Sequence, residues 1–311
     1  MQENTHLADL SISLFNRTLS NPTVLASGIL GVTKASIEFC SQRGAGAVTI
    51  KSVTRSPRKG HPLPIACGFE SGLLNAVGYS GPGYVSALQE FSGISKDCAA
   101  IGSIVAEDAE EYAFLAKEFI AKSDFWAFEI PLSCPHTPGF GELAGHSSPE
   151  ATFNIVQGIK RETNVPLIVK LSANAKGLGE VARAAQDAGA DAVCAVNTLG
   201  PGRAIDPFSR RTVLGYGSGG VSGPALKPVA LRAVYEIFQN VTIPIIGTGG
   251  ISTGLDAAEM LMAGATLIGI GTAVVTRGVD VFSKVCNELL EFMSEEGFDN
   301  VLQLRGLAHA S

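Results

Sequence analysis

The sequence lacks any dense cluster of Lys or Arg. The chain of 311 residues carries a formal net charge of −6, and only 17% of its residues are charged. Short basic groups such as Arg210-Arg211 are more typical of charged loops in solvent than of a surface that follows a phosphate backbone. We therefore expect no nucleic-acid partner.

Signals for secretion and for membrane insertion are also missing. The first ten residues, MQENTHLADL, have no basic flank followed by an apolar stretch, which a signal peptide would show. The longest uncharged stretch, 260–276, is rich in Gly, Ala and Thr. It fits a helix end, a turn and a buried strand better than a membrane span. We expect a cytoplasmic protein with no membrane contact.

The six cysteines are scattered without a C-x-x-C pair, which argues against a disulfide framework and a zinc ribbon. The spacing of Cys134, His136 and His146 also matches no common zinc pattern. A P-loop is absent, and the Gly-x-Gly-x-x-Gly pattern at 215–220 follows a polar loop instead of a strand. We expect no metal site and no Rossmann turn.

Short β-branched apolar runs alternate with amphipathic stretches along the whole chain. Continuous apolar strands separated by helices indicate a parallel sheet that is covered on both faces. Eight strands and about eight helices favour an α/β fold, a (β/α)8 TIM barrel in one domain (residues 1–311), over a doubly wound open sheet. The expected strands are 22–28, 47–52, 98–106, 125–133, 166–172, 192–198, 243–250 and 266–273.

Such a barrel typically takes about 250 residues, which leaves roughly 60 for insertions. We expect inserted loops after strands 2, 4 and 6. The first spans 53–82 and the last 199–222, while the loop after strand 4 is the Gly- and Pro-rich segment that begins at Cys134. No linker divides the chain.

Almost every expected strand ends on a polar residue, a lysine or a glycine. The carboxyl ends of all eight strands of a parallel barrel surround one mouth, so these groups should share one site. Gly249-Gly250 and Gly271-Thr272 follow strands 7 and 8, where barrels usually bind phosphate through backbone N–H groups and a helix N-terminus. We expect a phosphate-binding site there.

Lys51 and Lys170 each end an apolar strand, where a buried lysine is costly unless it is paired or functional. Since no acidic residue is adjacent to either in the sequence, we favour a Schiff base or a cation facing an anionic ligand over a structural ion pair. Cys134 also ends a strand. Because neighbours can lower the ordinary thiol pKa of about 8.5, it is a candidate general base. Cys194, in contrast, fits the core.

The chain resembles the class 1 dihydroorotate dehydrogenases, which are FMN-dependent barrels of pyrimidine biosynthesis. Cys134 in EIPLSCPH (129–136) resembles their catalytic segment, whereas class 2 relatives have serine. The segment GRAID is most similar to the NAD-linked B-type subgroup, whose catalytic subunit pairs with a second subunit. The resemblance covers nearly the whole chain, through LASGILG (25–31), IKSVT (50–54), LNAVGYSGPG (74–83), VNTLGPGRAID (196–206), GGVSGPALKP (219–228), IIGTGGIST (245–253) and GIGTA (269–273).

The resemblance implies that dihydroorotate is oxidised to orotate, with Cys134 removing the C5 proton while C6 delivers hydride to the flavin. It implies FMN, a homodimeric core and an electron-transfer subunit that carries FAD and an iron–sulfur cluster. The implied flavin contacts are Ser27, Lys51, Ser52, Ser103, Lys170, Val196, Gly223, Gly249, Gly250, Gly271 and Thr272. The implied substrate contacts are Lys51, Asn75, Ala76, Val77, Gly78, Tyr79, Asn197 and Thr198.

Three positions depart from the family pattern: Pro131, His136 and Ser103 stand where asparagine is usual. Pro131 cannot replace the amide donor, and losing one such hydrogen bond weakens binding by about 1–3 kcal/mol. Two alternatives stay open, and Pro131 supports the first of them. One is an FMN-dependent paralogue that acts on another cyclic amide or pyrimidine. The other is a flavin-free barrel lyase that forms a Schiff base on Lys51 or Lys170.

Overall fold

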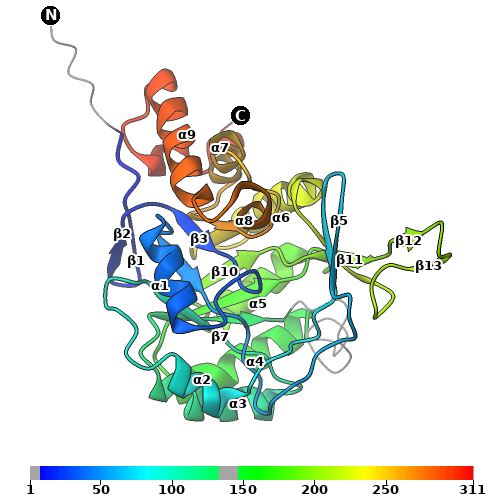
Figure 1. Ribbon diagram of the computed structural model, residues 1–311. Coiled ribbons are helices and arrows are strands. Elements are labelled where there is room, and N and C mark those ends of the chain that lie inside the picture. The colour runs from blue at the N-terminus through cyan, green and yellow to red at the C-terminus, as the bar shows by residue number, and fades with distance from the viewer. Residues whose placement is uncertain (1–7, 133–145, 311) are drawn as a thin grey trace, which may run out of the picture.

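The computed structural model describes residues 8–132 and 146–310 of the chain. Its centre is a closed barrel of eight parallel strands in the spatial order β10-β15-β16-β3-β4-β7-β8-β9 (Figure 1). Each strand lies inside one range expected from the sequence, so the TIM barrel is confirmed and the open sheet is wrong. The strands are β3 (Thr23–Leu25), β4 (Ala47–Thr49), β7 (Ala100–Ser103), β8 (Ala127–Pro131), β9 (Leu167–Leu171), β10 (Ala192–Ala195), β15 (Ile245–Thr248) and β16 (Leu267–Ile270).

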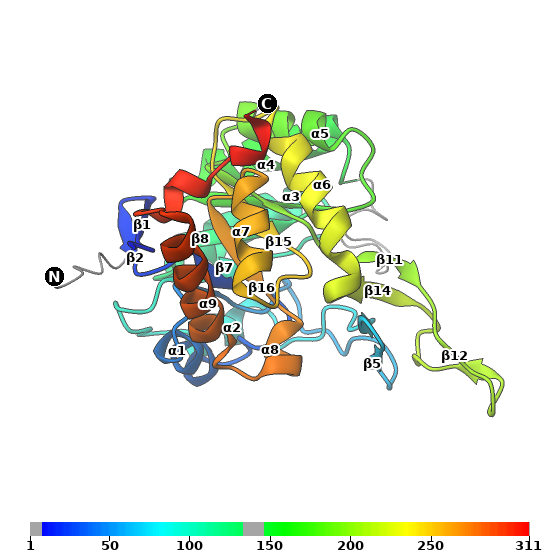
Figure 2. The ribbon, with the colours of Figure 1, turned by 90° about the horizontal axis from the view of Figure 1, so that it is seen from above.

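Helices pack around the outside of the strands (Figure 2). Local sequence sets where they begin: Thr253 accepts a hydrogen bond from the Asp256 amide at 3.2 Å, and Asp256 accepts one from the Thr253 amide at 2.8 Å. Ser148 caps the helix that begins at Pro149 with a single hydrogen bond, which its side chain accepts from the Ala151 amide at 3.2 Å. The helices are α1 (Lys34–Gln42), α2 (Tyr84–Glu90), α3 (Ala109–Glu118), α4 (Pro149–Glu162), α5 (Leu178–Asp187), α6 (Lys227–Phe238), α7 (Gly254–Met262), α8 (Ala273–Arg277) and α9 (Val281–Glu296), with 3₁₀ turns at Ile120–Lys122, Pro224–Leu226, Val301–Leu304 and Leu307–His309.

The insertions after barrel strands 2 and 6 pair with each other, a contact that their separation in the sequence hides. They form a four-stranded antiparallel sheet in the order β11-β14-β6-β5. The insertion expected after strand 4 lies outside the described residues. The paired strands are β5 (Ala66–Phe69), β6 (Gly72–Asn75), β11 (Leu199–Gly202) and β14 (Gly219–Ser222).

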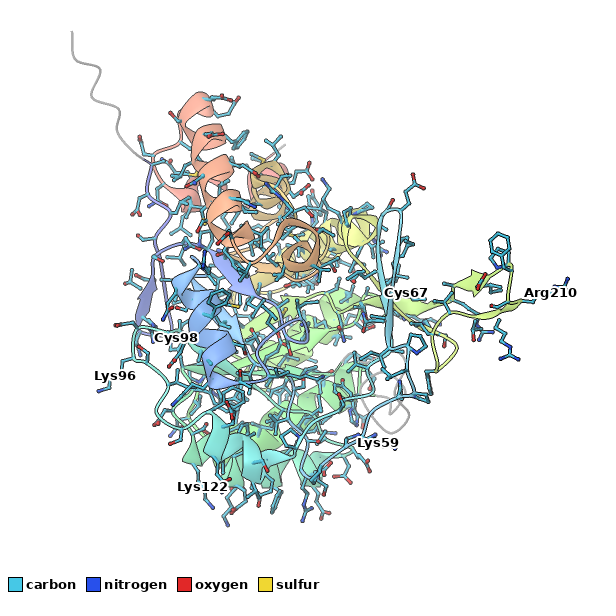
Figure 3. All side chains as sticks on the ribbon, viewed as in Figure 1. Lys59, Cys67, Lys96, Cys98, Lys122 and Arg210 are labelled. Carbon is cyan, nitrogen blue, oxygen red and sulfur yellow. The ribbon has the colours of Figure 1, made fainter. Side chains whose placement is uncertain are left out.

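Two short hairpins complete the fold. One, β1 (Ile12–Leu14) with β2 (Arg17–Leu19), lies near the N-terminus. The other, β12 (Ile205–Asp206) with β13 (Arg211–Thr212), projects away from the barrel in both ribbon views. Figure 3 shows Arg210 at its tip and Cys67 on β5, in the sheet from which it extends. No helix of the described ranges is long and apolar enough to cross a membrane.

The glycine pattern at 215–220 has a packing role. Gly219 and Gly220 belong to the antiparallel strand β14, which agrees with rejecting a Rossmann turn. A Cβ at Gly219 would collide with the Asn75 carbonyl, and one at Gly220 would collide with the Thr198 hydroxyl. These glycines therefore let β14 approach two segments that line the barrel mouth.

Candidate active site

A cavity of about 380 Å³ lies at the carboxyl ends of the barrel strands. The structure brings most of the expected site residues together there, because strand ends far apart in sequence meet at one mouth. Those that line it from the expected flavin set are Ser27, Lys51, Ser52, Lys170, Val196, Gly223, Gly249, Gly250, Gly271 and Thr272. Those from the expected substrate set are Asn75, Val77, Gly78, Tyr79, Asn197 and Thr198, with Lys51 common to both.

Two expected residues do not line this cavity. Ala76 is fully buried and packs with Leu74 and Leu214 in a small apolar cluster. Ser103 is also fully buried, and its Oγ lies 2.9 Å from the Oγ of Ser52, which does line the cavity. Ser103 thus contacts a residue that lines the cavity but does not line the cavity itself. Cys134 and His136, the expected base and its neighbour, lie outside the described residues.

Glycines after strands β15 and β16 form one wall of the cavity. Gly249 and Gly250 have φ values of +135° and +79°, and a Cβ on Gly250 would lie 2.5 Å from the Cβ of Lys227. Both positions therefore need glycine. Gly271 and Thr272 lead directly into α8, so backbone N–H groups gather here as an anion or phosphate site requires.

A cluster of ion pairs stabilises the loop that carries Gly249 and Gly250. The Lys227 Nζ lies 2.6 Å from Asp256 Oδ1 and 2.9 Å from Glu259 Oε2. Asp256 also accepts hydrogen bonds from the amides of Ser252 and Thr253 at 2.9 and 2.8 Å. Burial raises the pKa of Asp256, but Lys227 and these amides outweigh it, so the pKa is lowered overall. The loop after β15 is thus fixed by an ion pair that stays charged at neutral pH.

Lys170 forms an ion pair, contrary to the expectation from sequence. Its Nζ lies 3.3 Å from Oε1 of Glu129, and the two side chains are only 6% and 4% exposed. Burial favours a lower pKa for Lys170, but the Glu129 carboxylate raises it overall. Glu129 stands on the neighbouring strand β8, so adjacency in sequence could not reveal it. The available signal was an acidic residue inside an apolar strand.

Cys194 is a core thiol, as the sequence suggested. It is 2% exposed, and its Sγ lies 3.4 Å from Oγ1 of Thr248. Burial raises its pKa to about 12, so it stays protonated at neutral pH. No group of three His, Cys, Asp or Glu within residues 8–132 and 146–310 is arranged to hold a metal ion.

Two amide side chains, those of Asn75 and Asn197, also line the cavity. Asn75 donates through Nδ2 to the Gly220 carbonyl at 3.3 Å, and Oδ1 of Asn197 accepts from the Thr198 amide at 2.9 Å. Lys51 lines the same cavity, and its backbone amide donates to the Gly31 carbonyl at 2.9 Å. Two lysines, two amides and a glycine wall suit a flat anionic ligand that is held beside a phosphate-bearing one.

Comparisons with known proteins agree with this geometry. The family model described as dihydroorotate dehydrogenase matches residues 9–293. The chain is 42% identical over 299 residues to the dihydroorotate dehydrogenase B (NAD(+)) catalytic subunit of Pyrococcus furiosus, covering 96% of this chain and 98% of the relative. It is 42% identical over 302 residues to the protein of the same name from Thermococcus kodakarensis, covering 97% and 99%.

The fold has a counterpart among solved structures. A crystal structure of DHODH in complex with ferulenol from Eimeria tenella superposes with a TM-score of 0.84 at 22% identity, covering 100% of this chain and 91% of that one. At that identity the likeness supports the barrel fold alone. The match of the family model, together with relatives near 40% identity over almost the full chain, shows that this protein belongs to the dihydroorotate dehydrogenase family.

Proposed function

We propose that this protein oxidises dihydroorotate to orotate in pyrimidine biosynthesis, as a flavin-dependent oxidoreductase acting on a CH–CH bond. The observation that carries the proposal is that Lys51, Asn75 and Asn197 line the same cavity as the glycine wall at 249–250. Cations and amide donors suit the carboxylate and carbonyl groups of a pyrimidine acid, and the glycine wall suits a cofactor phosphate.

We propose FMN as the cofactor, within one domain that spans residues 1–311. The chain's residues fit it, because Gly250 and Gly223 line the cavity with positive φ values, and a Cβ on either would lie 2.5–2.8 Å from neighbouring protein atoms. Glycine at both positions therefore keeps this backbone close-packed, with its N–H groups available to a phosphate. The glycines and Thr272 would hold the phosphate, while Ser27, Ser52, Lys170 and Val196 would face the ring. Bound FMN would supply a two-electron acceptor for the hydride of the substrate.

Cys134 is the proposed general base that removes the C5 proton. Its support is its place in the sequence, three positions after Pro131, which lines the cavity, and the resemblance of EIPLSCPH to the family's catalytic segment. Lys51, Asn75 and Asn197 would orient the substrate and stabilise charge that develops on its carbonyl and carboxylate groups.

We also propose a cytoplasmic homodimeric core that passes electrons to a separate subunit with FAD and an iron–sulfur cluster. The relatives' name, dihydroorotate dehydrogenase B (NAD(+)), catalytic subunit, supports a separate partner subunit. The homodimer and the partner's cofactors are what the family resemblance implies, and the location is what the sequence leads us to expect. A paralogue acting on another cyclic amide is the second candidate, favoured by Pro131 at the cavity wall. A Schiff-base lyase draws no support from Lys170, because the raised pKa beside Glu129 keeps its amine protonated.

The test is chemical identification of cofactor and product. Denaturing the purified protein should release FMN, identified by mass, and the holoprotein with dihydroorotate and a dye acceptor should produce orotate. Cys134→Ala should keep FMN but lose nearly all turnover at neutral pH. A flavin-loaded protein that forms no orotate, yet oxidises or reduces another cyclic amide, would replace this proposal with the paralogue.

A further inference from the structure

Four buried polar side chains form a row inside the barrel. They come from strands β8, β9, β10 and β15, which are consecutive in the barrel. The row consists of Glu129, Lys170, Cys194 and Thr248, which are 3%, 5%, 2% and 9% exposed. Glu129, Lys170 and Thr248 also line the cavity, so the row forms part of its inner wall.

The two charged side chains of this row, Glu129 and Lys170, form an ion pair with each other. Glu129 is the one acidic side chain among the described residues that line the cavity, and it faces Lys170 at 3.3 Å. The other titratable neighbour of Lys170 is Cys194, which is level with it on β10 and remains a neutral thiol. Lys51 contributes a second cation to the same cavity from the end of β4.

A buried ammonium group needs its counterion. Removing one partner of a buried ion pair leaves an uncompensated charge, which the protein avoids by shifting the pKa of the remaining group until it is neutral. For Lys170 without Glu129, burial alone would lower the lysine pKa. The carboxylate therefore decides whether this wall of the cavity presents an ammonium or a neutral amine.

We propose that Glu129 is a positioning residue that holds Lys170 as an ammonium ion against the cofactor ring and keeps that charge constant across the working pH range. The inference depends on the proposed function for the identity of the ring. A reduced flavin carries more negative charge than an oxidised one, so a constant ammonium ion favours binding of the reduced form. Glu129 thus affects the cofactor through Lys170 without needing to touch it.

The first experiment measures the affinity of the apoprotein for reduced FMN from neutral pH to about pH 9.5. This range lies below the ordinary lysine pKa of 10.5, so a Lys170 whose pKa is lowered by burial would lose its proton earlier than an ordinary lysine. In Glu129→Gln, affinity should fall by about tenfold across this range, because Lys170 loses its proton. The double variant Glu129→Gln/Lys170→Met, which has no charge to lose, should follow the wild-type pH dependence. If the affinity of Glu129→Gln for reduced FMN varied with pH as that of the wild type does, the proposal would be overturned. It would also be overturned if the double variant lost affinity with rising pH as steeply as Glu129→Gln.

The second experiment needs no cofactor, so it separates this inference from the proposed function. The unfolded chain keeps a proton on Lys170 up to its ordinary pKa of 10.5, whereas folded Glu129→Gln would lose that proton at a lower pH. The free energy of unfolding of apo Glu129→Gln should therefore rise with pH between about 7 and about 9.5, relative to the double variant. Identical pH slopes in the two variants would contradict the role of Glu129, whether or not FMN binds.

Discussion

The imidazole of His61 lies flat against the phenol ring of Tyr216, with ring centroids 3.8 Å apart and an interplanar angle of 3°. His61 belongs to the insertion after barrel strand 2, and Tyr216 belongs to the insertion after strand 6. The His61 amide also donates to the Val77 carbonyl at 3.1 Å. The stack therefore fixes the segment 75–79, which we expect to hold the substrate, against the second insertion.

Tyr216→Ala should loosen that segment without altering the strand ends. An aromatic pair contributes about 0.5–1.5 kcal/mol beyond burial, so KM for dihydroorotate should rise about three- to tenfold. Since Tyr216 does not line the cavity, kcat should change by less than about twofold. Steady-state kinetics with a dye acceptor measures both constants.

Tyr235 provides a matched control. It is 38% exposed, as Tyr216 is, and it also stacks on a histidine, His309, at 3.8 Å. It stands on α6 and does not line the cavity. Tyr235→Ala should leave KM unchanged, so an equal rise in both variants would show that the His61–Tyr216 stack has no special role at the site.

Gly250→Ala should weaken FMN binding by more than about tenfold, because a Cβ there would lie 2.5 Å from the Cβ of Lys227 and would displace the glycine wall. Titration of the apoprotein with FMN, followed by flavin fluorescence, measures the loss.

Gly297→Ala is the control. Gly297 has a similar φ of +76° at the end of α9, but nothing lies within 4 Å of its Cβ position. The Gly297→Ala variant should lose about 1 kcal/mol of folding stability and should bind FMN as tightly as the wild type. Equal FMN affinities in the two variants would contradict the placement of the phosphate.

Stability should fall in mild acid because of His146. Burial lowers its pKa below the ordinary 6.5, although the Glu107 carbonyl, 3.1 Å from its Nε2, opposes this. As pH drops below 6.5, the unfolded chain takes up a proton at this position before the folded protein does, so the free energy of unfolding decreases. Urea unfolding at several pH values should show a shallower decrease for His146→Gln. An unchanged slope in that variant would assign the acid sensitivity to other groups.

Pro131 offers a test of substrate choice. It lines the cavity at the end of β8, where the family pattern has an amide donor. Pro131→Asn should lower KM for dihydroorotate about fivefold or more, as expected for one recovered hydrogen bond to a polar ligand. Pro131→Ala removes the ring without adding a donor and should give no such gain. If Pro131→Asn instead raises KM for dihydroorotate, the result would indicate that Pro131 suits the binding of a different substrate.

The barrel could be predicted because its evidence is local. Each buried strand is a short apolar run, and its polar or glycine end, such as Lys51 or Gly249-Gly250, marks the mouth. What could not be predicted depends on contacts between strands. The partner of Lys170 is Glu129, 41 positions away, and the pairing of β6 with β14 joins residues about 145 apart. Glu129 stands out as an acidic residue inside an apolar strand, but neither pairing can be identified from one sequence, because each joins two different strands.

Side-chain direction was the other limit. Ala76 stands between Asn75 and Val77, which line the cavity, but it does not line it, because neighbouring positions of extended chain point to opposite sides. Ser103 contacts the lining residue Ser52 and does not line the cavity itself. Ala76 instead joins Leu74 and Leu214 in an apolar cluster. The family resemblance places a segment at the site, whereas the structure decides which of its side chains reach the cavity.

The most direct test of the central claim is to add dihydroorotate to the purified, FMN-loaded protein in the absence of oxygen and to record the flavin absorbance. We predict rapid bleaching in proportion to the bound flavin, with one orotate formed for each flavin reduced. A flavin that keeps its yellow absorbance with saturating dihydroorotate, while dithionite still bleaches it, would contradict the assigned reaction.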